Sequence, residues 1–183
     1  MELADWKRSL EEERKLRDES LAVDPKSPIP AEERKTFKGL DYYPPNPDYR
    51  FEVELHEHEE KQTVRMNTAS GQELELIRWG EFRFEFEGKR LTLQVYRRSP
   101  EDRWLFIPFR DRTNGKETYG AGRFLYFHLK EPNAGTGRLV LDFNRAYNPF
   151  CAYSPGHGCP LVPPENWLDV PIYAGEKVYA KRK

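Results

Sequence analysis

The chain has 183 residues, which is enough for one domain with a hydrophobic core of its own. Basic and acidic residues nearly cancel, and the formal net charge of -1 argues against a general nucleic-acid binder or a polybasic membrane anchor. No apolar run approaches the ~20 residues of a membrane span, and the acidic N-terminus lacks the apolar stretch of a signal peptide. We therefore expect a cytoplasmic protein with neither a nucleic-acid nor a membrane partner.

The composition points to a core built largely from aromatic side chains. Hydrophobic residues make up 37% of the chain, a low share, whereas aromatic residues make up 14%. Phenylalanine, tyrosine and tryptophan must then supply much of the buried area. The two methionines, two cysteines, fifteen prolines and many charged residues together resemble the composition of thermophile proteins.

Residues 1–49 are expected to form a helix followed by an extended connector. Residues 2–22 are expected to be helical, because helical spacing places five of them in one narrow stripe: Leu3, Trp6, Leu10, Arg17 and Leu21. Three prolines between residues 25 and 30 then break the helix. The segment 37–49 is rich in proline and tyrosine, so we expect it to lie extended across the body of the protein.

From residue 50 the apolar period changes from 3.6 to 2, which is typical of strands. The expected strands cover residues 51–55, 62–69, 74–86 with a bulge at Gly80, 91–95, 104–109, 122–129 and 139–143, with two short ones at 170–173 and 177–179. A turn is expected at 133–137. No strand–helix–strand alternation is visible, so a parallel sheet is not expected.

We therefore predict a mainly β fold, either an antiparallel β-barrel or a sandwich meander. It carries an N-terminal helix and an irregular, proline-rich C-terminal wrap. Residues 1–49 and 50–183 are expected to form one structural unit. A barrel is favoured because a long meander with few devices that protect its edges usually closes.

The segment 110–123 carries four cations around glycines, including Arg123. Arginine side chains and free backbone N–H groups in such a loop can hold an anion. The alternative is a charged hairpin tip, since Asn114-Gly115 is a common hairpin turn. The segment matches neither a P-loop nor a dinucleotide-binding fingerprint.

The segment 142–160 holds both cysteines in a run of turn-forming residues. Cys151 and Cys159 can be structural thiols, a disulfide, zinc ligands together with His157, or nucleophiles. Their spacing matches none of the common zinc signatures, so no metal site is expected. His56 and His58 share a strand face, which we interpret as solvated rather than metal-binding.

Two carboxylates are candidates for acid–base chemistry. Asp142 directly follows an expected buried strand, where it can pair with an arginine such as Arg123 or cap the next loop. It can also act as a general base if its surroundings raise its pKa. Glu165, which follows a pair of prolines, is the second candidate base.

Several stretches of the chain together resemble one family. They are DFNRAYNP at 142–149 with Cys151 and Cys159, PPENWL at 163–168, AGEK at 174–177, ETYGAGR at 117–123, FKGL at 37–40 and YYP at 42–44. This set is similar to the signatures of the domain-of-unknown-function family 1684. The resemblance implies no activity, but it implies that the segments around Arg123 and the two cysteines belong to one signature.

Three functions fit these features. The first is a β-barrel that binds a small polar or anionic ligand. Its expected ligand-binding residues are Tyr119, Gly120, Gly122, Arg123, Asn144, Tyr147 and Tyr153. The second is a hydrolase-type enzyme with Asp142 or Glu165 as base, or with Cys151 or Cys159 as nucleophile. The third is a structural module without a ligand, and the sequence indicates no particular cofactor or oligomeric state.

Overall fold

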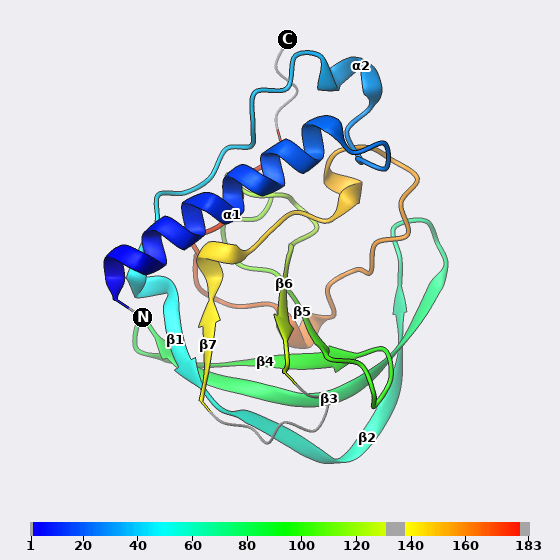
Figure 1. Cartoon of the computed structure of the whole chain (residues 1–183). Coiled ribbons are helices and arrows are strands. Elements are labelled where there is room, and N and C mark those ends of the chain that lie inside the picture. Colours follow the sequence, from blue (N-terminus) through cyan, green and yellow to red (C-terminus); the bar gives the residue numbers. More distant parts are fainter. Residues whose placement is uncertain (1, 131–137, 180–183) are drawn as a thin grey trace.

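A computed structural model of the chain describes residues 2–130 and 138–179 (Figure 1). The helices in this part are α1 (Leu3–Val23), α2 (Ala31–Arg34) and the 3-10 helices η1 (Pro47–Tyr49), η2 (Phe143–Arg145), η3 (Phe150–Ala152) and η4 (Pro164–Asn166). Its strands are β1 (Arg50–Val53), β2 (Leu55–Asn67), β3 (Glu73–Phe86), β4 (Lys89–Arg97), β5 (Trp104–Phe109), β6 (Arg123–His128) and β7 (Leu139–Asp142). The predicted class, mainly β with a long N-terminal helix, is confirmed.

The strands form two antiparallel sheets rather than a barrel. The larger sheet has the order β2-β3-β4-β5-β6, and β1 pairs with β7 in a separate two-stranded sheet. Because β1 and β7 pair with each other, neither joins β2 to β6 among the described residues, and the larger sheet does not close. The preference for a barrel was therefore wrong, and the two stacked layers resemble a sandwich.

The predicted bulge at Gly80 is present. The pairing of β3 with β4 shifts register between Arg78 and Gly80. A Cβ atom at this glycine would lie 2.5 Å from the carbonyl oxygen of His56. Only glycine permits β2 to approach β3 this closely. The bulge at this position also bends β3 and with it the larger sheet.

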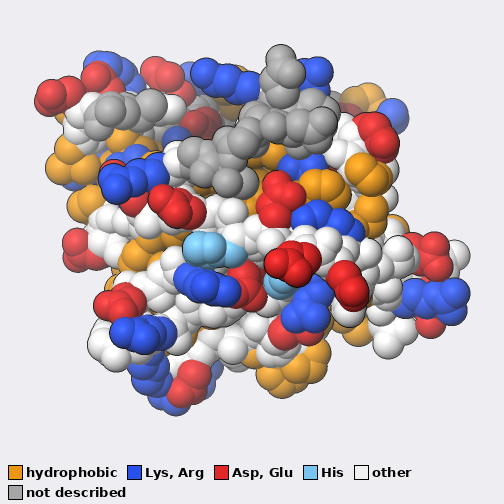
Figure 2. Space-filling model, turned by 90° about the horizontal axis from the view of Figure 1, so that it is seen from below, with side chains coloured by type: hydrophobic (Ala, Val, Ile, Leu, Met, Phe, Trp, Pro, Cys, Tyr) orange, Lys and Arg blue, Asp and Glu red, His pale blue; other side chains and the backbone are white. Residues whose placement is uncertain are grey.

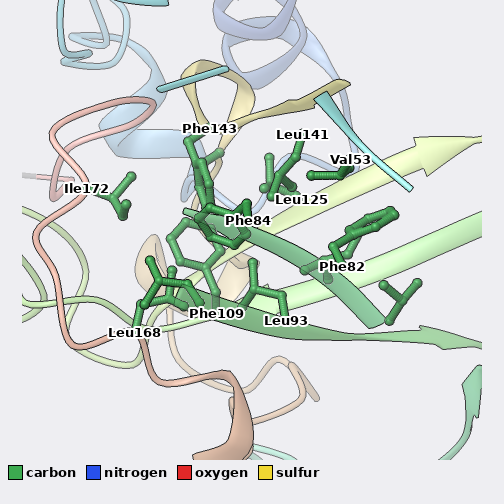
Figure 3. Close-up of a cluster of buried hydrophobic side chains, with 14 of the residues drawn as sticks. Val53, Phe82, Phe84, Leu93, Phe109, Leu125, Leu141, Phe143, Leu168 and Ile172 are labelled. Atoms are coloured by element: carbon green, nitrogen blue, oxygen red, sulfur yellow. The ribbon is translucent and has the colours of Figure 1, made fainter. Parts of the chain in front are cut away.

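The main core lies between the two sheets and combines aliphatic side chains with a group of aromatic rings (Figure 3). Phe143, directly after β7, is fully buried. Its ring centroid lies 5.1 Å from that of Phe109, 5.8 Å from that of Phe84 and 5.9 Å from that of Phe51. One ring therefore joins β1, β3 and β5, as the aromatic composition suggests.

Helix α1 lies across the ends of β1 and β7 (Figure 1). Trp6, Leu10 and Leu21 are buried as the stripe predicts, whereas Leu3 is 49% exposed. The indole of Trp6 donates a hydrogen bond to Asp142 Oδ2 at 2.7 Å, which fixes the start of the helix to the end of β7.

Two surface properties bear on partners. None of the helices in the described ranges combines the length and apolar composition needed to cross a bilayer. Figure 2 shows lysine and arginine side chains interspersed with aspartate and glutamate side chains over one face. That face therefore presents no large block of a single charge.

The C-terminal segment wraps the sheets without forming strands, so the short strands expected at 170–173 and 177–179 were wrong. Val170, Ile172 and Ala174 are buried, as their apolar character suggests. Side chains rather than a neighbouring strand bind much of the backbone here: Asp111 accepts the N–H of Ile172 at 3.1 Å, and Arg123 donates to several carbonyl oxygens. The turn expected at 133–137 lies outside the described residues.

Candidate functional site

A hollow of about 600 Å³ opens on the face of the larger sheet that points away from β1 and β7. Its lining consists of Leu74, Leu76, Arg97, Arg98, Asp102, Trp104, Phe106, Tyr126, Gly158 and Pro160. The volume lies inside the range of roughly 300–1,000 Å³ that is typical of small-molecule sites. Four strands and the C-terminal wrap thus contribute to one concave surface.

Three aromatic rings form a row along this hollow. Phe106 on β5 and Tyr126 on β6 are direct cross-strand partners, and their rings stack with centroids 5.0 Å apart. Trp104 lies two residues before Phe106 on the same strand face, with its ring centroid 6.0 Å from that of Tyr126. Trp104 is 49% and Tyr126 is 40% exposed. Trp104 and Tyr126 are therefore partly open to a ligand, whereas Phe106 is buried.

The floor of the hollow is apolar. Leu76 and Phe106 are buried and belong to a second hydrophobic cluster, which also includes Val162 of the wrap. Leu74 packs against the same cluster and is half-buried. An apolar floor beside exposed aromatic rings favours a ligand with an apolar or planar body.

Charged groups stand at the turn between β4 and β5. Asp102 accepts the backbone N–H of Trp104 at 3.0 Å and that of Arg98 at 3.4 Å, which holds the turn together. The side chain of Arg98 is exposed, whereas Arg97 is buried with its guanidinium 3.9 Å from the Trp79 ring centroid.

Arg98 also lies beside one of the three rings. Burial raises the pKa of the Tyr126 phenol, and Arg98, which hydrogen-bonds to it, acts in the opposite direction. An exposed guanidinium therefore stands next to the hydroxyl group of a partly exposed tyrosine.

The C-terminal wrap completes the rim of the hollow. Gly158 and Pro160 belong to the segment that holds both cysteines. The carbonyl oxygen of Cys159 accepts a hydrogen bond from the N–H of Ala69 at 2.9 Å, and the N–H of Leu161 donates to the carbonyl oxygen of Asn67 at 2.8 Å. These bonds tie the wrap to the turn between β2 and β3 and so fix the position of the rim.

Arg123, the expected anion-binding residue, lies elsewhere and is fully buried. Its guanidinium pairs with Asp111 at 3.0 Å and donates to the carbonyl oxygens of Ile172 at 2.9 Å, Glu176 at 3.1 Å and Ala174. Burial lowers its pKa, while Asp111 acts in the opposite direction. Because these N–H groups bond to the protein itself, Arg123 is suited to hold the C-terminal wrap in place.

The residues before Arg123 also make close contacts within the protein. Gly122 has a φ of 107°, and a Cβ atom there would lie 2.6 Å from the carbonyl oxygen of Phe109. Tyr119 is half-buried; burial raises its pKa, and the nearby thiols of the cysteine loop add to the increase. Gly120 is exposed. This loop therefore lies near the segment that holds both cysteines, as expected if both belong to one signature.

The expected loop residues after β7 divide into two groups. Asn144 exchanges hydrogen bonds with the backbone of Asn46 at 2.9 and 2.8 Å, and Tyr153 donates to Glu176 Oε2 at 3.0 Å, so both hold distant segments together. Tyr147 instead stacks on Tyr126 at 6.1 Å and 19°. Of these three, Tyr147 supports the aromatic row directly.

The two candidate bases are both engaged in ion pairs. Asp142 is buried and pairs with Arg50 at 3.3 Å and with Arg145, in addition to its bond from Trp6. Glu165 accepts a hydrogen bond from Tyr96 and lies 3.5 Å from Arg78. Neither carboxylate lines the 600 Å³ hollow.

The two cysteines are half-buried free thiols in direct contact. The N–H of Cys151 donates to Cys159 Sγ at 3.3 Å, and the Cys151 thiol donates to the carbonyl oxygen of His157 at 3.0 Å. Burial and a side-chain hydrogen bond with the Cys151 thiol raise the pKa of Cys159 to about 11, while the bond from the Cys151 N–H acts in the opposite direction. A thiol that stays protonated at neutral pH is a poor nucleophile.

The rings of His157 and His58 are hydrogen-bonded to other polar side chains. The ring of His157 bonds to Ser154 Oγ at 3.0 Å, and the ring of His58 bonds to Gln94 Oε1 at 2.8 Å. Over residues 2–130 and 138–179, histidine, cysteine, aspartate and glutamate form no group of three or more placed to hold a metal ion.

The aromatic row itself was not predicted. We expected the strand at 104–109 to be buried on both faces, but Trp104 is half exposed. The available signal was the position of tryptophan at the first residue of β5 and of tyrosine between Leu125 and Phe127. The position of the C-terminal wrap decides which face of β6 is exposed. Alternation of apolar and polar residues along the strand does not reveal that position.

Comparison with known proteins adds the family. No curated protein matches the chain. The solution NMR structure of an uncharacterized protein from Haloarcula marismortui is similar, with 37% identity, a TM-score of 0.75 and a match that covers 95% of each chain. The family model described as protein of unknown function (DUF1684) matches residues 35–177. The match takes in the connector, the Arg123 segment and the cysteine loop, so the chain belongs to that family.

Proposed function

We propose that the protein binds a small organic anion with a flat apolar body in the hollow lined by Trp104, Phe106 and Tyr126. The observation that carries the proposal is the row of three rings, two of them partly exposed, over an apolar floor. Exposed aromatic side chains cost free energy in water, and stacking against a ligand removes that cost.

The preference for an anion follows from the charges around the rings. Arg97 and Arg98 line the hollow, while Asp102 is the one carboxylate among the lining residues. Asp102 already accepts two backbone hydrogen bonds, so it repels a ligand less than a free carboxylate would. Arg98, exposed beside Tyr126, is placed to pair with a carboxylate or phosphate on the ligand.

This proposal keeps the expected ligand class and moves the site. The closing segment is still the cysteine loop, through Gly158 and Pro160, but the anion partner becomes Arg98 in place of Arg123. The contacts of Arg123 favour a structural role for its segment beside the binding site. A cytoplasmic location remains part of the proposal.

Intrinsic tryptophan fluorescence tests the proposal directly. Trp104 and Trp167 are both about half exposed, at 49% and 52%, and only Trp104 lines the hollow. We would titrate the protein with a panel of aromatic carboxylates and their neutral amides. A binding carboxylate is expected to change the emission of wild type and of Trp167→Phe, and to leave that of Trp104→Phe unchanged.

Two outcomes would count against the proposal. One is an emission change that persists in Trp104→Phe and disappears in Trp167→Phe. The other is a panel in which no compound binds. Equal binding of carboxylates and amides would retain the hollow as a site but remove the role of Arg98.

A further inference from the structure

A second and much smaller cavity, of about 110 Å³, lies between α1 and the segment that follows β7. Its volume corresponds to roughly four water molecules at about 30 Å³ each. That is the space of one tetrahedral oxyanion rather than of a nucleotide. Its lining includes three arginines, namely Arg14 and Arg17 of α1 and Arg145 of η2.

Two of these arginines have carboxylate partners. Arg17 forms an ion pair with the buried Glu176. Arg145 pairs with Glu13 at 2.8 Å and with Asp142. For both, burial lowers the pKa of the guanidinium, but the neighbouring carboxylates raise it by more. The positive charge of each is therefore compensated within the chain.

Arg14 differs from its two neighbours. Its guanidinium donates to the carbonyl oxygens of Tyr43 at 2.9 Å and Asn144 at 3.3 Å and lies 4.6 Å from the Tyr42 ring centroid. Among the described residues no carboxylate lies within ion-pair distance of it, and its Nε atom is buried without a hydrogen-bond partner. Burial accordingly lowers its pKa, and the nearby charges do not reverse that.

The charged residues that line the cavity have a net charge of +1. The three arginines contribute +3, and the lining carboxylates Glu13 and Glu176 contribute -2, so the sum is +1. Beyond the lining residues, Glu11, Asp18 and Asp142 also act on Arg14 over longer distances, and Asp142 pairs with Arg50 at 3.3 Å. A partly buried arginine without a carboxylate in direct contact is costly, and guanidinium groups suit an oxyanion.

We infer that a small oxyanion of the size of phosphate or sulfate binds in this cavity and neutralises Arg14. Two of the arginines that would bind the anion already link separate parts of the chain. Arg17 of α1 pairs with Glu176 of the C-terminal wrap, and Arg145 after β7 pairs with Glu13 of α1. The site is separate from the aromatic hollow, and neither inference depends on the other.

Thermal unfolding in phosphate or sulfate at constant ionic strength, balanced with sodium chloride, tests this inference. The melting temperature of wild type is expected to rise with the logarithm of the oxyanion concentration once the Kd is exceeded. The matched control is Lys15→Gln, which removes one positive charge from a side chain of the same helix that is 77% exposed. This variant should retain the full rise, whereas Arg14→Gln should keep only the smaller rise that sulfate and phosphate cause by their exclusion from the protein surface.

An equal rise in Arg14→Gln, or no rise in wild type, would overturn the inference. If Arg14→Gln does not fold, crystals of the wild-type protein grown in selenate provide a second test. An anomalous peak within hydrogen-bond distance of the Arg14 guanidinium is expected, and its absence would equally refute the site.

Discussion

At the scale of single residues, the Asp111–Arg123 pair makes the clearest prediction for stability. Both side chains are fully buried, and between them they bind the backbone of the wrap at Ile172, Ala174 and Glu176. Arg123→Met leaves the carboxylate of Asp111 buried without its counter-charge. We expect a loss of about 3–5 kcal/mol in the free energy of unfolding, measured by urea denaturation.

The control is Arg112→Met, which removes an exposed arginine that pairs with Asp169. This variant should lose far less stability, because exposed ion pairs contribute little. The double variant Arg123→Met/Asp111→Asn should lose less than the sum of its two single changes. A stable Arg123→Met variant that no longer binds a ligand would instead restore the original interpretation of this arginine.

The cysteine loop yields a prediction for chemical reactivity. Because burial and Cys151 raise the pKa of Cys159 to about 11, very little thiolate is present at neutral pH. In peptide-resolved mass spectrometry, Cys159 of the native protein should react with iodoacetamide more slowly than in urea, where the ordinary pKa of about 8.5 applies. Faster reaction in the native state would favour the hypothesis of a cysteine nucleophile.

At the scale of elements, α1 provides a matched pair of leucines. Leu10 is 1% exposed and Leu16 is 64% exposed on the same helix. Leu10→Ala should cost about 2–5 kcal/mol of unfolding free energy, because it opens a cavity beneath the helix. Leu16→Ala should change stability by less than about 0.5 kcal/mol. Similar losses in both variants would show that the helix does not pack as described.

The elements also show what periodicity can and cannot predict. The end of β3 follows its alternation, because Phe82 and Phe84 are buried in the main core while Arg83 and Glu85 are exposed. Residues 170–176 also include apolar side chains but form no strand, since Arg123 and Asp111 bind their backbone. These partners are some 50 residues distant in the chain, so no local pattern could indicate them. The open face of β6, and with it the aromatic row, was missed for the same reason.

At the scale of the whole molecule, the many buried tyrosines predict a dependence of stability on pH. Burial raises the pKa of Tyr42, Tyr147 and Tyr153 above the ordinary value, so these phenols stay protonated in the native state. In the unfolded chain they ionise near pH 10. The unfolded state then binds fewer protons, so the free energy of unfolding falls as pH rises through and above about 10.

Urea denaturation across the neutral and alkaline range measures this effect. Tyr153→Phe should lose stability at neutral pH, because Glu176 loses a hydrogen bond, and should show a weaker alkaline decline. A stability that is constant to pH 11 would contradict the burial of these phenols.

The whole-molecule architecture was only partly predictable. A change of period at residue 50 correctly separates the N-terminal helix from the β region. Whether the meander closes depends on which edges pair over long range, and β1 pairs with β7 across some 90 residues of chain. The aromatic residues of the core were identifiable by type, but the hollow forms only where Trp104, Tyr126 and Pro160 meet.

The central claim is that the aromatic hollow is the binding site, and NMR chemical-shift mapping tests it most directly. The tightest compound from the fluorescence panel would be titrated into the labelled protein. We predict that the largest shifts occur at the indole N–H of Trp104 and at the backbone of Asp102, Tyr126 and Gly158. Shifts concentrated at Tyr119 to Arg123, or none in the hollow at saturating ligand, would contradict the claim.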